Sequence, residues 1–230
     1  MKARSDGRTP DQMRPMKAEV GVIPNADGSA MFKIGNTVAY AAVYGPREMY
    51  PRFLQDPKKG ILRCAYNMMP FSGHGDRVRP GGSRRSKEIS AVTENALRQV
   101  IDLSEYPNAV VDVFIELPQT DAGTRCAGIT AAAMALADAG LKMKDLVASM
   151  SMGVLDGEIL TDVNGHEDCV LGATDVPIAY IPDFDKISLL QLDGEISRET
   201  LKKLLEIGKK KCLEIYKVQQ KALKKKYKVD

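Results

Sequence analysis

A glycine-containing turn followed by an alanine-rich stretch is the part of the sequence best suited to chemistry. The stretch from Gln119 to Gly140 reads QTDAGTRCAGITAAAMALADAG. This order predicts a buried helix that begins at Gly123, Thr124 and Arg125. The first N–H groups of a helix lack partners within it and the helix dipole is positive there, so the turn is suited to bind orthophosphate or a phosphate ester. The alternative is that Thr124 is an ordinary cap and Arg125 a surface cation.

Two adjacent arginines precede a second predicted helix. Residues 86–101 carry apolar side chains at the spacing of an amphipathic helix, which places Arg84 and Arg85 at its start. Cations at this end oppose the helix dipole, so the pair indicates a bound anion that compensates them. A solvated pair is the alternative.

Acidic residues gather in the segment NGHEDCVLGATDV, residues 164–176. The pattern predicts that Glu167, Asp168 and Asp175 lie in a loop between two strands. Arg63 lies inside a predicted strand, residues 61–69, next to a glycine-rich basic loop at 71–83. Solvated turns for the acids and a solvent-facing charge for Arg63 are the alternatives.

Composition excludes several other classes of protein. The chain has 230 residues, of which 44% are hydrophobic and 27% charged, and no apolar run approaches the roughly 18 residues that cross a bilayer. Its first residues are too polar for a signal peptide, so we expect a cytoplasmic protein without a membrane partner. The four cysteines form no zinc-ligand pattern and are expected to be reduced, and two histidines are too few for a triad or a metal cluster.

The order of the predicted elements indicates the fold class. Strands, a helix, a strand, a helix, further strands and a last helix predict an α+β or mixed α/β layer fold, with residues 1–230 as a single domain. The last helix covers about 197–226 and is rich in lysine, and we expect the end at 224–230 to be frayed. This helix and the basic block at 77–87 permit a polyanionic partner.

Several motifs, in one order over nearly the whole chain, resemble the RNase PH family, and within it most closely the catalytic ring subunit of the archaeal exosome. They are SDGRTPDQMRPMKAEVGVIPNADGSAMFKIGNTVAYAAVYGPRE, YNMMPFS, SRRSKEIS, the stretch from Gln119 to Gly140, ATDVPIAYIP and LLQLDGEIS. The resemblance implies an RNase PH-like fold (ribosomal protein S5 domain 2-like), with mixed sheets packed against helices. It also implies a six-membered ring with a central pore.

The resemblance assigns roles to residues one by one. Gly123, Thr124 and Arg125 match the phosphate-binding turn of the family, and Arg84 and Arg85 match the pair that grips the RNA backbone.

Three further residues match more distant parts of the family's site. Asp175 matches the catalytic aspartate, and Arg63 matches an arginine at the constriction where single-stranded RNA enters. Asp168 would join Asp175 in holding a metal ion, but the spacing between the two acids is one residue longer than is usual for the family.

The activity implied by the resemblance is 3′→5′ degradation of single-stranded RNA by phosphorolysis. Inorganic phosphate is the co-substrate, Mg²⁺ is a candidate cofactor, and nucleoside 5′-diphosphates are released in a reversible reaction that also adds 3′ tails. The implied partners are a homologous non-catalytic ring subunit, in a heterohexamer of three heterodimers, and RNA-binding cap subunits. The alternatives are a non-catalytic RNA-binding ring subunit and a homohexameric RNase PH that trims tRNA 3′ ends.

Overall fold

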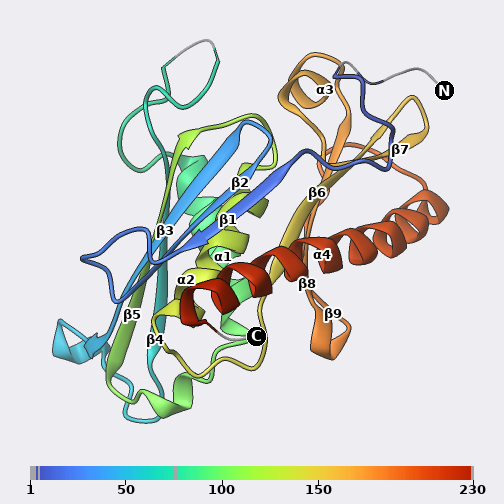
Figure 1. The fold of residues 1–230 in the computed structure, drawn as a ribbon. Coiled ribbons are helices and arrows are strands. Elements are labelled where there is room, and N and C mark those ends of the chain that lie inside the picture. Colours follow the sequence, from blue (N-terminus) through green and yellow to red (C-terminus); the bar gives the residue numbers. More distant parts are fainter. Residues whose placement is uncertain (1–3, 5, 75–76, 229–230) are drawn as a thin grey trace.

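Two β-sheets with helices packed between and across them form the chain in a computed structural model (Figure 1), which describes residues 4, 6–74 and 77–228. The first sheet contains five strands in the order β1-β2-β3-β5-β4. Its pairs are antiparallel except that β4 runs parallel to β5. The bounds are β1 (Met16–Val20), β2 (Gly28–Ile34), β3 (Thr37–Glu48), β4 (Ile61–Met68) and β5 (Ala109–Gln119).

The second sheet contains four antiparallel strands in the order β7-β6-β8-β9. Its strands are β6 (Ala148–Leu155), β7 (Glu158–Thr161), β8 (Thr174–Ile181) and β9 (Lys186–Leu190). Asp156 and Gly157, both with positive φ, form the two-residue turn between β6 and β7, which is the geometry that favours an Asp-Gly pair in a hairpin.

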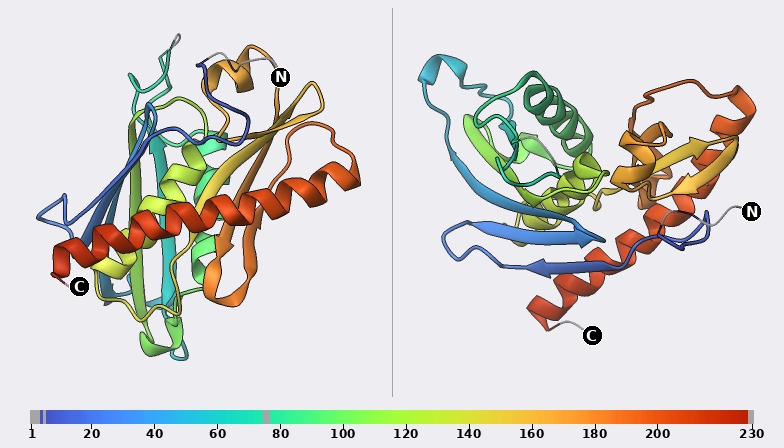
Figure 2. Two further views of the ribbon diagram at one scale, coloured as in Figure 1. Left: turned by 45° about the vertical axis from the view of Figure 1, so that its right-hand side comes forward. Right: turned by 90° about the horizontal axis from the view of Figure 1, so that it is seen from above.

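The helices are α1 (Arg84–Arg98), α2 (Thr124–Asp138), α3 (Gly165–Cys169) and α4 (Arg198–Tyr227), and short 3-10 turns cover Arg52–Leu54, Leu103–Glu105 and Pro182–Phe184. Helix α2 lies between the two sheets, and every residue of it except Arg125 and Ala137 is buried. Its small side chains allow both sheets to approach. Helix α4 crosses both sheets and contacts β1, β6, β7 and β8 (Figure 2). The predicted α+β fold is therefore confirmed.

Three local predictions need correction. The acidic segment is not one loop, because Glu167 and Asp168 lie on α3 and Asp175 is the second residue of β8. Helix α1 ends at Arg98 rather than at residue 101. The C-terminal end is helical through Tyr227, whose hydroxyl donates to an oxygen of Asp138 at 2.8 Å, so the predicted fraying does not hold as far as residue 227; residues 229–230 lie outside the described part.

The two sheets share one hydrophobic core, and the single domain stays a prediction. One continuous cluster of buried apolar side chains includes Leu62 and Ile115 of the first sheet, Ile129 of α2, and Met152 and Ile178 of the second sheet. These buried side chains connect the two sheets through α2. Whether the two halves fold as one unit stays a prediction.

The structure also bears on the cysteines and on possible membrane-spanning helices. None of the four cysteines forms a disulfide in the structure, and their reduced state stays a prediction. No helix in the described ranges is both long enough and apolar enough to span a membrane.

Candidate active site

The start of α2 has the geometry of an anion-binding turn. Gly123 precedes the helix in the left-handed conformation, with φ of 61°, and Ala122 before it also has a positive φ of 52°. A left-handed alanine is uncommon, and such backbone strain is often found at functional sites. No side chain of the described residues caps this helix end. The first N–H groups of α2 are therefore available to an anion, as the sequence predicts.

The back of this turn is fixed by hydrogen bonds. The hydroxyl of Thr37 donates to the carbonyl oxygen of Ala122 at 2.7 Å and accepts from the N–H of Asp121 at 2.9 Å. The carbonyl oxygen of Asp121 accepts from Nη1 of Arg14 at 2.6 Å. Because these bonds hold the carbonyl side of the turn, its conformation is set before any ligand binds.

Arg125 is held in place rather than being a free surface cation. Its Nη1 donates to Oε1 of Gln191, and it lies 3.5 Å from Oε1 of Glu88 on α1. Gln191 in turn donates to Glu88 at 2.8 Å. Both contacts are made by Nη1, so among the described residues neither Nε nor Nη2 of Arg125 has a hydrogen-bond partner.

Asp175 faces the start of α2 from the second sheet. One of its carboxylate oxygens accepts a hydrogen bond from the hydroxyl of Ser151 on β6. Burial raises the pKa of Asp175, although the Ser151 hydrogen bond and the charge of Arg125 oppose this shift. A carboxyl group with a raised pKa is suited to donate a proton.

Asp168 joins this site from α3. The pKa of its carboxyl group is raised, first by burial and then by the nearby charge of Asp175. Helix α3 is fixed by a capping box, in which the side chain of Asn164 accepts from the N–H of Glu167 at 2.9 Å and Glu167 accepts from the N–H of Asn164 at 3.0 Å. This short helix places Asp168 in the lining of the same recess as Asp175.

Most of the predicted site residues line one small recess. Its lining consists of Arg85, Ala122, Gly123, Thr124, Arg125, Cys126, Ser151, Asp168, Asp175 and Pro177. Helix N-terminal amides, two arginines and two carboxylates thus meet where the two sheets face each other.

Two predicted residues do not line this recess. Arg84 occupies the first turn of α1 and is exposed. Arg63 lies on β4, where its Nε and Nη2 donate to the two carboxylate oxygens of Asp112 at 2.7 and 2.9 Å. The pairing with Asp112 shows that Arg63 is engaged within the sheet surface, as the solvent-face alternative expects.

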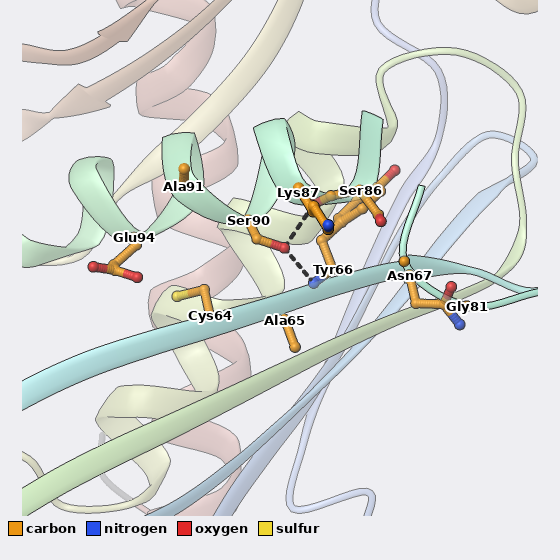
Figure 3. Close-up of a pocket in the computed structure, with 11 residues that line it drawn as sticks. Cys64, Ala65, Tyr66, Asn67, Gly81, Ser86, Lys87, Ser90, Ala91 and Glu94 are labelled. Carbon is orange, nitrogen blue, oxygen red and sulfur yellow. Dashed lines mark hydrogen bonds between the residues drawn. The ribbon is translucent and has the colours of Figure 1, made fainter. Parts of the chain in front are cut away.

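A larger groove of about 510 Å³ lies beside the recess, between the edge strand β4 and α1 (Figure 3). The N–H of Tyr66 donates to the hydroxyl of Ser90 at 2.9 Å, and Ser90 donates to the carbonyl oxygen of Ser86 at 2.7 Å. These bonds fix the first turns of α1, including Arg85, against β4. The predicted site residues do not line this groove.

Few side chains of the recess could hold a metal ion. Within the described ranges, no group of three or more His, Cys, Asp or Glu side chains is placed to hold a metal ion. Asp168 and Asp175 are two carboxylates, which is compatible with Mg²⁺ because this ion often binds through one or two carboxylates plus substrate phosphates.

Sequence reasoning missed three residues that shape the site. Ser151 positions Asp175, Gln191 positions Arg125, and Arg14 holds the turn at the start of α2. Arg14 belongs to a segment with two other arginines, and this cluster of charges near the N-terminus was the available signal. Ser151 and Gln191 carry no comparable signal.

A helix start without a side-chain cap that faces two carboxyl groups has a geometry suited to an enzyme acting on phosphate esters. The sequence matches the 3′ exoribonuclease family, domain 1, over residues 12–142 and domain 2 of the same family over residues 145–211. The chain therefore belongs to the RNase PH family of 3′ exoribonucleases.

Curated relatives match almost the whole chain. The chain is 48% identical to exosome complex component Rrp41 of Methanopyrus kandleri and 50% identical to that of Thermococcus kodakarensis. Each match covers 97% of this chain, and 93% and 89% of the respective relative.

Solved structures share the fold. Rice Rrp46 superposes with a TM-score of 0.86 at 25% identity, covering 96% of this chain and 100% of that one. A chain from the Archaeoglobus fulgidus exosome with RNA bound to the active site superposes with a TM-score of 0.80 at 24% identity, covering 92% of this chain and 91% of that one.

Proposed function

We propose that this protein degrades single-stranded RNA from its 3′ end by phosphorolysis. The observation that carries the proposal is the recess in which the free N–H groups of α2, Arg125 and Arg85 face Asp175. Attack of orthophosphate on a phosphodiester brings two anions together, so positive charge and N–H donors are the main requirement of the site.

The nucleophile is assigned to the start of α2. Orthophosphate is held by the N–H groups at Gly123, Thr124 and Arg125 and by the guanidinium of Arg125. Its oxygen attacks the phosphorus of the last internucleotide linkage, and the bond from phosphorus to the 3′ oxygen of the preceding nucleotide breaks. The products are a nucleoside 5′-diphosphate and an RNA shortened by one nucleotide, and the reverse reaction extends RNA.

The scissile ester is assigned to Arg84 and Arg85, and the leaving group to Asp175. Asp175 has one of two roles. Its protonated carboxyl group donates a proton to the departing 3′ oxygen, or its carboxylate, together with that of Asp168, would hold a Mg²⁺ ion that neutralises phosphate charge. Arg63 remains a proposed contact for RNA at the entrance, and its guanidinium would have to exchange Asp112 for the RNA backbone.

Hydrolysis by two metal ions is the chemical rival. That mechanism needs a compact set of carboxylates to hold both ions and activate water. The described residues supply two carboxylates in the recess but several anion-binding groups. This balance favours phosphate over water as the attacking group.

The physiological form is proposed to be an exosome ring in the cytoplasm. The relatives with 48–50% identity are named exosome complex components. We propose a heterohexamer with a homologous non-catalytic subunit, completed by RNA-binding cap subunits. The presence of Asp175 and the arginines in one recess disfavours a purely RNA-binding ring subunit.

The test is the dependence of the products on phosphate. The full chain with its ring partner is incubated with a short oligoadenylate, with and without inorganic phosphate, and the products are separated by chromatography. We expect nucleoside diphosphates with phosphate and almost no degradation without it. Nucleoside monophosphates released at full rate in phosphate-free buffer would sink the proposal.

The substitution Arg125→Ala tests whether this residue binds the phosphate. Arg125→Ala removes a charge-assisted contact worth roughly 1.5–3 kcal/mol, so the phosphate concentration for half-maximal rate should rise by about tenfold or more. The matched control is Arg84→Ala, which should weaken RNA binding and leave the phosphate requirement within about twofold.

A further inference from the structure

We propose that Arg14 is a positioning residue whose buried ion pair with Asp162 fixes the phosphate-binding turn relative to Asp175. The proposal rests on the phosphorolytic function above. It concerns two residues that lie behind the recess and line none of it.

Arg14 joins the turn to the second sheet. Its Nε and Nη2 donate to the two carboxylate oxygens of Asp162 at 2.8 and 2.7 Å, and its Nη1 donates to the carbonyl oxygen of Asp121 at 2.6 Å. The planar guanidinium thus binds a carboxylate in two places and the turn in a third. A lysine has one nitrogen and does not reproduce this geometry.

Asp162 links Arg14 to Ser151, which in turn binds the carboxyl group of Asp175. It has a left-handed backbone, with φ of 55°, and its N–H donates to the carbonyl oxygen of Ser151 at 3.0 Å. The hydroxyl of the same Ser151 binds Asp175. One chain of contacts therefore runs from the turn through Arg14, Asp162 and Ser151 to the carboxyl group of Asp175.

The connection is buried and fully bonded. Arg14 is 6% exposed and Asp162 is 2% exposed. The carbonyl oxygen of Asp162 also accepts from Arg4 at 2.9 Å and from Arg8 at 3.1 Å. A buried charge pair costs desolvation and adds little net stability, so its value here lies in the geometry that it imposes.

This geometry matters because the nucleophile and the acid come from different sheets. The turn belongs to the connection from β5 to α2, and Asp175 belongs to β8. A displacement of about 1 Å between reacting groups can reduce a rate by about a hundredfold. Loosening the pair should therefore impair the use of phosphate, whereas RNA binding by α1 should be affected less.

The experiment compares Arg14→Lys with Asp138→Asn in the full chain with its ring partner. Asp138→Asn is the control, because Asp138 also belongs to a buried ion pair: it accepts from the N–H of Ser29 at 2.9 Å and from Nζ of Lys226, yet it lies at the C-terminal end of α2 and contacts no atom of the turn. The KM for phosphate, the KM for RNA, kcat and the Tm are measured for each. We expect Arg14→Lys to raise the phosphate KM about tenfold or more and the RNA KM less than about threefold, with Asp138→Asn leaving the phosphate KM within about twofold.

Each outcome decides the matter. A wild-type chain that degrades RNA without phosphate would overturn both this inference and the proposed function. A phosphate-dependent wild type in which Arg14→Lys and Asp138→Asn change the phosphate KM equally, or not at all, would overturn this inference alone. If Arg14→Lys does not fold, Asp162→Asn, which keeps the shape of the side chain, takes its place with the same expected change in phosphate KM, and an unchanged value would overturn the inference.

Discussion

The carboxyl group of Asp175 illustrates how the surroundings of one residue determine its chemistry. Burial raises its pKa, the charge of Asp193 acts in the same direction, and Ser151 and Arg125 act against it. The net effect is a raised pKa, so the carboxyl group of Asp175 stays protonated to a higher pH than that of an exposed aspartate. In the proposed mechanism this is the form that donates a proton to the departing 3′ oxygen.

Asp175→Asn should abolish turnover and leave RNA affinity nearly intact. The substitution removes an acid or metal ligand at almost constant volume and removes no cation, so the rate should fall by about a hundredfold or more, with binding changed by less than about twofold. Rates on oligoadenylate and filter-binding affinities check both parts. A variant whose activity stays within about threefold of the parent would remove Asp175 from the mechanism.

The same variant has an expected effect on stability. A raised pKa in the folded state means that the carboxyl group stabilises the fold at low pH and that this contribution is lost as pH rises through the raised pKa. Asparagine does not titrate, so Asp175→Asn should have a higher Tm than the parent near pH 7. The difference should become smaller as the pH falls below the usual value for an aspartate. Thermal unfolding at several pH values measures it.

The sequence predicts site residues that are adjacent in the chain, but not contacts between distant positions. Gly123, Thr124 and Arg125 are adjacent, so the turn was evident from local signals alone. Ser151 lies in a strand of alternating small residues, and its contact with Asp175 spans 24 positions. The partner of Arg14 lies 148 positions away. Such contacts follow from how the sheets pack, which no local pattern encodes.

Among the secondary-structure elements, α3 shows why the acidic segment was predicted incorrectly. A helix of five residues is too short for an apolar period to be visible. Its stability comes from the capping box and from Arg4, which lies 163 positions before Glu167 and makes a buried pair with it. The long helices and the strands, in contrast, were predictable because each repeats its pattern over many residues.

Helix α4 provides a prediction about packing. Gly208 lies on its buried face, and a Cβ added there would come 2.2 Å from Cδ1 of Ile178, a residue with no exposed surface. Alanine is favoured over glycine in a helix by about 1 kcal/mol, but overpacking a dense core costs roughly 1–3 kcal/mol. Gly208→Ala should therefore destabilise the protein by about 1 kcal/mol, which lowers the Tm by roughly 2–4 °C.

The control for this prediction is on the exposed face of the same helix. Lys210→Ala changes a residue that is exposed and should leave the Tm within about 1 °C. Calorimetry of the two variants and the parent makes the comparison. A Gly208→Ala protein more stable than its parent would show that α4 moves away from the sheet at little cost.

Large apolar side chains are exposed on the outer side of the first sheet. On the face away from α2, Phe114 is 43% exposed and Tyr40 is 37% exposed, and Phe53 on the β3–β4 connection is 83% exposed. In the proposed ring, a neighbouring subunit could cover this face. The recess itself is small, so one chain offers few contacts for a polymer.

The chain alone should therefore be poorly active, and activity should appear with a homologous, catalytically silent partner in an alternating ring of six subunits. The physical reason is that single-stranded RNA is held by many backbone contacts, whose number increases when several subunits surround the strand. Light scattering gives the mass of the chain, of the partner and of their mixture, and rates on oligoadenylate are measured for the same three samples. A monomeric chain with the full activity of the mixture would defeat this prediction. A mixture that forms the ring but shows no more activity than the chain alone would restrict the partner to a structural role.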